Sequence, residues 1–162
     1  SQAAEYTGVV IDARAIAVSP ALFPKVQDPQ KKDVYSVKHV SQDDLQKRGM
    51  ASYATVSRDV QITRLFPKAL VIPVSYMPEG AADSAKAKRR QGYKPLVVKA
   101  TGADGKAIKA NLVVSEEDAR KLQQLDQATG ALKQCRVVVV VSSEVGGLEG
   151  LLLPDAVQPN GN

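Results

Sequence analysis

The feature that most constrains the fold is a run of five consecutive valines, from Val137 to Val141. Side chains alternate across a β-strand, so an all-valine strand has two apolar faces. The run therefore predicts a strand that is covered on both sides, or that lies at the centre of a sheet. A helix is the weaker interpretation, because β-branched side chains lose rotamer freedom in helices and fit a pleated surface.

The length of 162 residues allows one domain with a sizeable core. Hydrophobic residues make up 44% and charged residues 24%, which is typical of a globular chain. Only 4% are aromatic and there is no Trp, so the core must consist of Val, Leu, Ile and Ala. No apolar stretch approaches the roughly 20 residues that cross a bilayer, so no transmembrane segment is expected.

Two helices are predicted from their starts. Ser41 can cap a helix with Asp44 at the capping-box position, and we expect that helix to continue through Gly49 and Met50 towards Tyr53.

The second start is Ser115, followed by Glu116, Glu117 and Asp118. Apolar residues then recur at helical spacing, and Gly130 ends the helix.

The remaining regular segments are predicted strands. Residues 6–14 form the first strand, and residues 15–18 extend it or begin another. A hairpin joins residues 25–28 to residues 34–37 through a polar loop that contains Pro29. A second hairpin joins 95–100 to 108–114 through Asp104-Gly105.

These elements predict an α+β fold, with a mixed, mainly antiparallel sheet and two helices packed on one face. We expect a single domain over 1–162, with a loop insertion at about 60–92 and a flexible C-terminal tail from about 154. The apolar residues 148–153 can either dock another subunit or fold back on the chain's own sheet edge.

Charge and cysteine content exclude several classes of function. The net charge of +5 is mild, and the only dense basic cluster is residues 86–90, so nucleic-acid binding is not expected. The single Cys135 excludes an internal disulfide and a cysteine-based zinc site, and is expected to be a small buried hydrophobe. We expect no cofactor and no metal.

Three segments together resemble an uncharacterised family of exported bacterial proteins: residues 6–14 with Pro20-Ala21-Leu22-Phe23-Pro24-Lys25, residues 95–100, and residues 113–119 running on to 135–140. That family resembles soluble periplasmic relatives of flagella-associated outer-membrane lipoproteins. The resemblance implies the cell envelope and no enzymology. The chain departs from the pattern in two ways: it shows no N-terminal lipid-acceptor cysteine, so no outer-membrane anchor is expected, and the segment 60–92 is longer. The small and polar residues 1–5 would fit a mature exported protein, and an end introduced for recombinant expression would look the same.

Asp12 and Arg14 are candidate binding residues, expected two apart on one face of the first strand. They can line a polar groove, but we favour a structural role in which Arg14 reaches a carboxylate on a neighbouring strand or Asp12 caps a turn. His39 can act as a proton shuttle, yet a solvated histidine at a strand end is the better interpretation.

Lys86, Lys88, Arg89 and Arg90 form the second candidate binding site. On a loop they can contact an anionic partner such as lipid phosphates or an acidic protein, and the alternative is a solvated loop. The carboxylate clusters at residues 43–44 and 116–118 can hold a hard cation, but the helix dipole already explains them.

The leading hypothesis is a non-enzymatic, periplasmic cell-envelope module that binds a protein partner or self-associates, with a flagellum or secretion association implied by the resemblance. One alternative is a binder of anionic polymer or membrane surface through residues 86–90. The other is an enzyme using Asp12, Arg14 and His39, which requires these three side chains to converge in one pocket.

Overall fold

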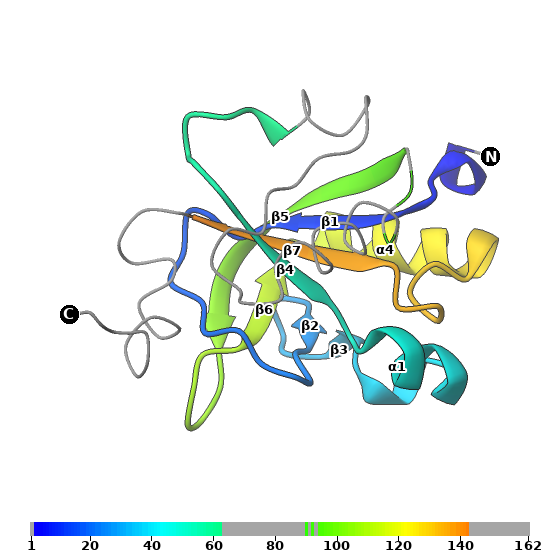
Figure 1. Ribbon diagram of the computed structural model, residues 1–162, viewed down its shortest axis with the longest axis horizontal. Helices are drawn as coiled ribbons and strands as arrows, with labels where there is room; N and C mark the ends of the chain where they lie inside the picture. The colour runs from blue at the N-terminus through cyan, green and yellow to red at the C-terminus, as the bar shows by residue number, and fades with distance from the viewer. Residues whose placement is uncertain (1, 63–89, 91, 93, 143–162) are drawn as a thin grey trace.

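The valine run forms strand β7 (Val137–Ser142), and every residue of this strand is buried. The computed structural model describes residues 2–62, 90, 92 and 94–142. In it β7 lies between β1 (Gly8–Asp12) and β4 (Ser52–Val56) and runs parallel to both (Figure 1). The prediction of a strand covered on both sides is therefore confirmed.

The two faces of β7 enter two different apolar clusters. Val137, Val139 and Val141 belong to the larger cluster, which also holds side chains of both α-helices. Val138 and Val140 point to the opposite face and pack with a smaller group that includes Val10, Ala54, Val56 and Ile62. Neither face of the strand carries a polar side chain before Ser142, as two dry surfaces require.

Seven strands form one mixed sheet in the order β3-β2-β6-β5-β1-β7-β4. The strands not yet given bounds are β2 (Val26–Gln27), β3 (Asp33–Tyr35), β5 (Pro95–Asp104) and β6 (Asn111–Val114). The β2–β3 and β5–β6 pairs are the two predicted hairpins, and both are antiparallel. The other four pairings are parallel. The mixed sheet is confirmed, but "mainly antiparallel" is wrong, because hairpin signals reveal only pairings between neighbours in sequence.

Both predicted α-helices exist, and their starts are confirmed. In α1 (Gln42–Arg48) and α4 (Glu116–Thr129) the capping serine accepts a bond from the backbone N–H three residues on, as the capping motif requires. Gly130 ends α4 in the left-handed conformation with a φ of 72°. Gly49, with a φ of 75°, likewise ends α1, so the expected continuation towards Tyr53 is wrong. Tyr53 lies in β4 instead.

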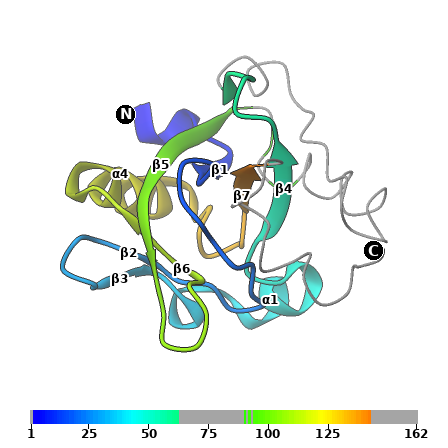
Figure 2. The same cartoon turned by 90° about the vertical axis from the view of Figure 1, so that its left-hand side faces the viewer.

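Both helices contribute to one face of the sheet, as predicted (Figure 2). Leu122 and Leu125 of α4 are fully buried in the larger cluster, and Leu45 of α1 packs against it. The described residues also include two short 3-10 helices, η1 (Gln2–Glu5) and η2 (Val37–His39). Within the described residues, no helix has the length and apolar character needed to span a bilayer.

The first strand is shorter than predicted. It ends at Asp12, and residues 15–18 form no strand, so that extension is wrong. Most of the expected insertion, all of the expected tail and the apolar residues 148–153 lie outside the described residues.

Candidate functional site

Asp12 and Arg14 form an ion pair at the carboxyl end of β1. The Arg14 guanidinium donates from Nε to Oδ1 of Asp12 at 2.9 Å and from Nη2 to Oδ2 at 3.1 Å. Asp12 Oδ1 also accepts the backbone N–H of Arg14 at 3.1 Å, so the carboxylate caps the turn that follows the strand. The expectation that both residues share a face of the strand is wrong, because the strand has ended before Arg14.

The remaining donor of Arg14 holds a distant segment in place. Nη1 donates to the carbonyl oxygens of Ser57 and Val60, at 2.6 Å each. These two residues follow β4, so the arginine joins the carboxyl ends of β1 and β4. Its side chain is only 12% exposed. Each guanidinium nitrogen thus has a protein partner, and this geometry serves structure rather than ligand binding.

His39 lies in η2, away from this ion pair. Its Nδ1 accepts the backbone N–H of Ser36 at 3.1 Å and lies 3.0 Å from the Ser36 hydroxyl. Two residues after His39, the Ser41 N–H donates to the Lys133 carbonyl, in the segment that leads into the amino end of β7. His39 is therefore near the amino ends of the parallel strands, whereas Asp12 and Arg14 are at the carboxyl ends. The three side chains do not converge.

Arg90 is buried rather than exposed on a loop, with 6% of its surface accessible. Its guanidinium donates to the carbonyl oxygens of Arg48 and Gly49, at the end of α1. A cation at this position complements the negative end of the helix dipole. The prediction that Arg90 is an exposed cation on a loop is therefore wrong. Lys86, Lys88 and Arg89 lie outside the described residues.

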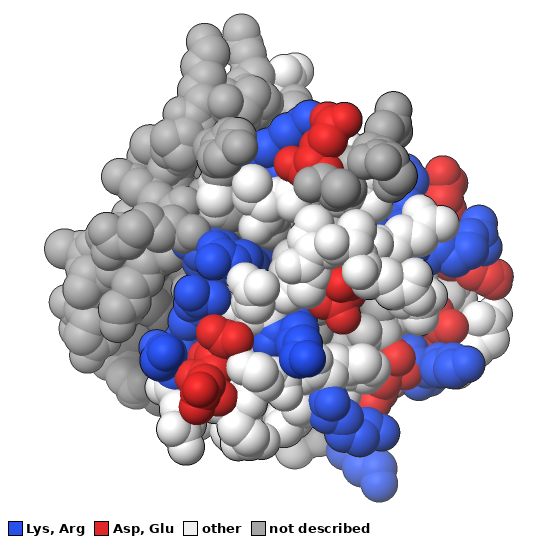
Figure 3. Space-filling view, turned by 90° about the vertical axis from the view of Figure 1, so that its right-hand side faces the viewer, with Lys and Arg blue, Asp and Glu red and all other residues white. Residues whose placement is uncertain are grey.

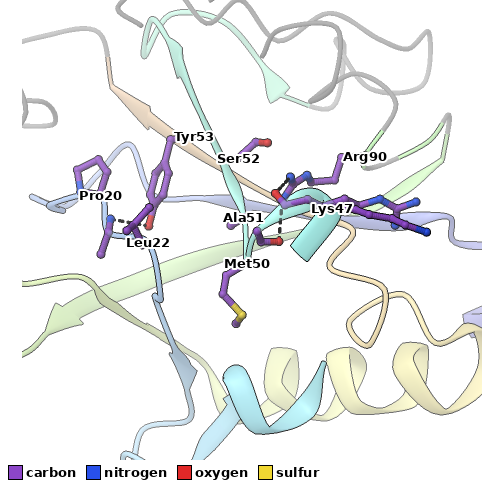
Figure 4. A pocket seen from close by; sticks show the side chains of 11 residues that line it. Pro20, Leu22, Lys47, Met50, Ala51, Ser52, Tyr53 and Arg90 are labelled. Atoms are coloured by element: carbon purple, nitrogen blue, oxygen red, sulfur yellow. Dashed lines mark hydrogen bonds between the residues drawn. The ribbon is translucent and has the colours of Figure 1, made fainter. Parts of the chain in front are cut away.

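A pocket of about 430 Å³ lies between the segment after β1 and the turn from α1 into β4. We call it the α1–β4 pocket. In Figure 4, Pro20, Leu22 and Tyr53 lie at one end, Lys47 and Arg90 lie at the other, and Met50, Ala51 and Ser52 lie between them. The described residues that line it are Pro20, Ala21, Leu22, Lys47, Arg48, Gly49, Met50, Ala51, Ser52, Tyr53 and Arg90. The pocket thus has an apolar end and a basic end.

The described lining residues are unbalanced in charge, since they include three basic residues and no acidic one. Arg48 is already engaged: its Nη1 donates to the Gln134 carbonyl at 2.7 Å and lies 3.6 Å from Asp44. Arg90 is engaged by the carbonyls described above. Lys47 is exposed and has no ion pair within the described part of the chain. It is the cation most accessible to a ligand.

Tyr53 supplies a buried hydroxyl at the apolar end. The oxygen accepts the Ala21 N–H at 3.3 Å, which leaves the hydroxyl proton without an acceptor among the described residues. The residue is 5% exposed, and burial raises the pKa of Tyr53 to about 12. The phenol is therefore protonated at neutral pH and can donate to a ligand.

Leu22 and Phe23 extend the apolar end onto the surface, with exposed fractions of 82% and 59%. They are the two most exposed large hydrophobic residues in the part of the chain that the structure describes. Pro20 and Pro24 bracket them and restrict the backbone, and the chain bends at both Leu22 and Phe23.

The family model described as Treponema pallidum Tp0624, second domain, matches residues 8–143. The match begins at the first residue of β1 and ends one residue after β7, so it spans the sheet together with α1 and α4. This chain belongs to that family. The predicted membership of an uncharacterised family is confirmed to this extent, while the link to flagella-associated lipoproteins remains a prediction. None of the curated proteins matches the chain.

In this member of the Tp0624 second-domain family, a further basic side chain, that of Arg136, lies close to Arg48 of the pocket lining. Arg136 donates from Nε to the Gln134 side-chain carbonyl at 2.8 Å, so Gln134 links it to Arg48. Burial, together with the nearby charge of Arg48, lowers the pKa of Arg136. Figure 3 shows that basic and acidic side chains alternate over this end of the molecule, so no single sign of charge covers it.

The buried Cys135 is no candidate nucleophile in this family member. Its side chain is fully buried, and burial raises the pKa of the thiol, which disfavours the reactive thiolate. The expectation of a buried small hydrophobe at this position is confirmed. Among the described residues, no group of three His, Cys, Asp or Glu side chains is placed to hold a metal ion.

Sequence reasoning missed the α1–β4 pocket, because its described walls come from three separate parts of the chain: residues 20–22, residues 47–53 and Arg90. One signal was available: Leu22 and Phe23 stand between prolines and follow neither helical nor strand periodicity. Apolar residues outside any periodic element are poorly placed to enter a core. Nothing in the sequence pattern indicated that Tyr53 would face them.

Proposed function

We propose that the chain is a non-enzymatic module of the cell envelope that binds a protein partner or assembles with copies of itself. Its binding surface is the α1–β4 pocket together with Leu22 and Phe23. The observation that carries this proposal is the exposure of Leu22, which lines a pocket with a basic end, and of Phe23 next to it in the sequence. Exposed apolar residues beside a concave site are typical of interaction surfaces.

The positions of the other candidate residues favour binding over catalysis. Asp12 and Arg14 bind each other, and Arg14 also binds the segment after β4, so neither is available to a substrate. His39 lies at the opposite end of the strands. Catalysis by these three residues would require them to reach one reacting group. Arg90 is engaged at the end of α1, which disfavours the proposal that residues 86–90 act together as a surface cluster.

The location in the periplasm, and an association with flagella or secretion, are proposed from the resemblance of three sequence segments to exported bacterial proteins. Fractionation of native cells with an antibody to the chain tests the location. We expect the protein in the periplasmic or membrane fraction, and recovery in the cytosol alone would contradict it.

Site-specific photo-cross-linking tests the binding surface. A photoreactive phenylalanine analogue at position 23 is expected to give a discrete cross-linked species in native cells. The matched control is the same analogue at Ile108, which is 50% exposed at the turn between β5 and β6. Cross-links that are equal at both positions would contradict a specific surface.

The identity of the cross-linked species separates the two forms of the proposal. A product of twice the mass of the chain indicates self-association, and a larger or smaller partner indicates a second protein. In both cases Leu22→Ser with Phe23→Ser should abolish the complex in size-exclusion chromatography, while Ile108→Ser should not. A complex that survives the double substitution would exclude this surface.

A further inference from the structure

The α1–β4 pocket carries a further inference about the chemistry of its ligand, and this inference rests on the proposed binding function. We propose that the pocket binds an extended peptide segment of a partner protein in which an apolar residue is followed by an acidic one. The apolar side chain packs at the end formed by Pro20 and Leu22, its backbone carbonyl accepts the Tyr53 hydroxyl, and the carboxylate faces Lys47.

The two ends of the pocket differ in polarity, and this difference sets where the apolar and the anionic group of a ligand lie. Pro20, Leu22 and Tyr53 lie at one end and Lys47 and Arg90 at the other, as Figure 4 shows. A ligand that fills the pocket must therefore be apolar at one end and anionic at the other. Lys47 is exposed at this end and has no ion pair within the described part of the chain, and no carboxylate stands among the described lining residues, so an acidic group is favoured there.

The Tyr53 hydroxyl distinguishes a peptide from a lipid. It lies at the apolar end, belongs to a residue that is only 5% exposed, and has a proton for which the described residues supply no acceptor. An acyl chain packed against Leu22 would cover this donor and leave it unpaired, which is costly. A peptide brings a carbonyl oxygen close to its apolar side chain, and that oxygen can accept the bond.

The size of the pocket is consistent with a short segment. A volume of about 430 Å³ lies in the range of small-ligand pockets and accommodates a short stretch of peptide. Leu22 lines the pocket and is 82% exposed, so it offers apolar surface beyond the pocket as well. The adjacent Ser52 hydroxyl lies between the two ends and can donate to the peptide backbone.

Two blocked dipeptides test the inference by titration into the ¹⁵N-labelled protein, followed by NMR. The probes are acetyl-Leu-Asp-amide and acetyl-Leu-Asn-amide, which differ only in the acidic group. We expect both to shift the backbone amides of Leu22, Ser52 and Tyr53, with about fivefold tighter binding of the aspartate peptide.

Two variants divide the contributions of charge and hydrogen bond. Lys47→Gln should remove the preference for the aspartate peptide, while Lys38→Gln, which makes the same charge change in η2, should retain it. Tyr53→Phe should weaken both peptides by about fivefold, since its lost bond goes to a carbonyl that they share. Its NMR spectrum also shows whether the fold is retained.

Each remaining outcome contradicts the inference. Equal affinity for the two peptides, shifts away from the pocket, or undiminished binding by Tyr53→Phe would overturn it. So would shifts of the same amides by phosphatidylglycerol vesicles but not by the peptides, which would assign the pocket to a lipid. If the peptides fail while the cross-link at position 23 persists, the binding function stands and only the ligand class is wrong.

Discussion

Arg14 is the residue whose role is most clearly defined by its contacts. It joins β1 to the segment after β4 with bonds to one carboxylate and two carbonyl groups. Removing it leaves Asp12 and both carbonyls short of a partner in a largely buried place, and that loss exceeds the value of an exposed ion pair. The structural role that the sequence analysis favoured for Arg14 over ligand binding is thus the one that these contacts support.

Arg14→Ala should lower the free energy of unfolding by about 2–3 kcal/mol in urea denaturation. Arg14→Lys should recover little, because an ammonium group cannot match the fork geometry. The control is Lys121→Ala, whose partner Glu117 is 71% exposed and whose loss should cost less than about 0.5 kcal/mol. Similar costs for Arg14→Ala and Lys121→Ala would refute the clamp.

Tyr35 gives a prediction in which stability depends on pH. Its hydroxyl donates to the Met50 carbonyl at 2.8 Å, and burial raises its pKa well above the ordinary value of 10.0. The folded state thus holds this proton more tightly than the unfolded state does. The associated stability is present below pH 10.0 and is lost as the pH rises above it.

Tyr35→Phe should cost about 1–2 kcal/mol at neutral pH, since the Met50 carbonyl loses its donor. The variant should also lose less stability than the parent between neutral pH and about pH 11, because it has no phenol to ionise. Urea denaturation across this range measures both effects. Tyr6→Phe is the control, and an equally steep alkaline loss in Tyr35→Phe and the parent would count against the argument.

At the scale of elements, the start of α4 shows how much a helix cap contributes to the stability of the fold. Ser115 Oγ accepts the Asp118 N–H at 3.0 Å, and three acidic residues follow in the first turn. Ser115→Ala should lower the free energy of unfolding by about 1 kcal/mol, whereas Ser115→Asp should be close to neutral. Thermal and urea denaturation check both values. A neutral Ser115→Ala would mean that packing of Leu122 and Leu125 alone fixes the helix.

Local signals also explain which elements were predictable. Serine caps, Gly130 and the two hairpin turns act within a few residues, so both helices and both antiparallel pairs could be predicted. The four parallel pairings depend on contacts between segments far apart in the chain, for which a sequence has no short-range signal. The same limit applies to the α1–β4 pocket, whose walls meet only in the folded chain.

At the scale of the whole molecule, β7 connects two cores that the sheet separates. Its odd-numbered valines pack with the helices, and its even-numbered valines pack with Val10 and Ala54 on the other face. This arrangement requires that neither face accept a polar group. It also requires the chain to have a second cover besides the helices, to which Ile62 and the partly buried Val60 contribute.

Val→Thr substitutions on successive residues of β7 test this arrangement, because they keep the shape of the side chain and add a hydroxyl. Val138→Thr and Val139→Thr should each lower the free energy of unfolding by about 1–3 kcal/mol, since each hydroxyl enters a dry cluster on a different face. The control is Val37→Thr in η2, at a residue 39% exposed, with an expected change below about 0.5 kcal/mol. Urea denaturation gives all three values. If Val139→Thr is costly and Val138→Thr is tolerated, then the face opposite the helices is open to water, and a strand of five valines has one dry side only.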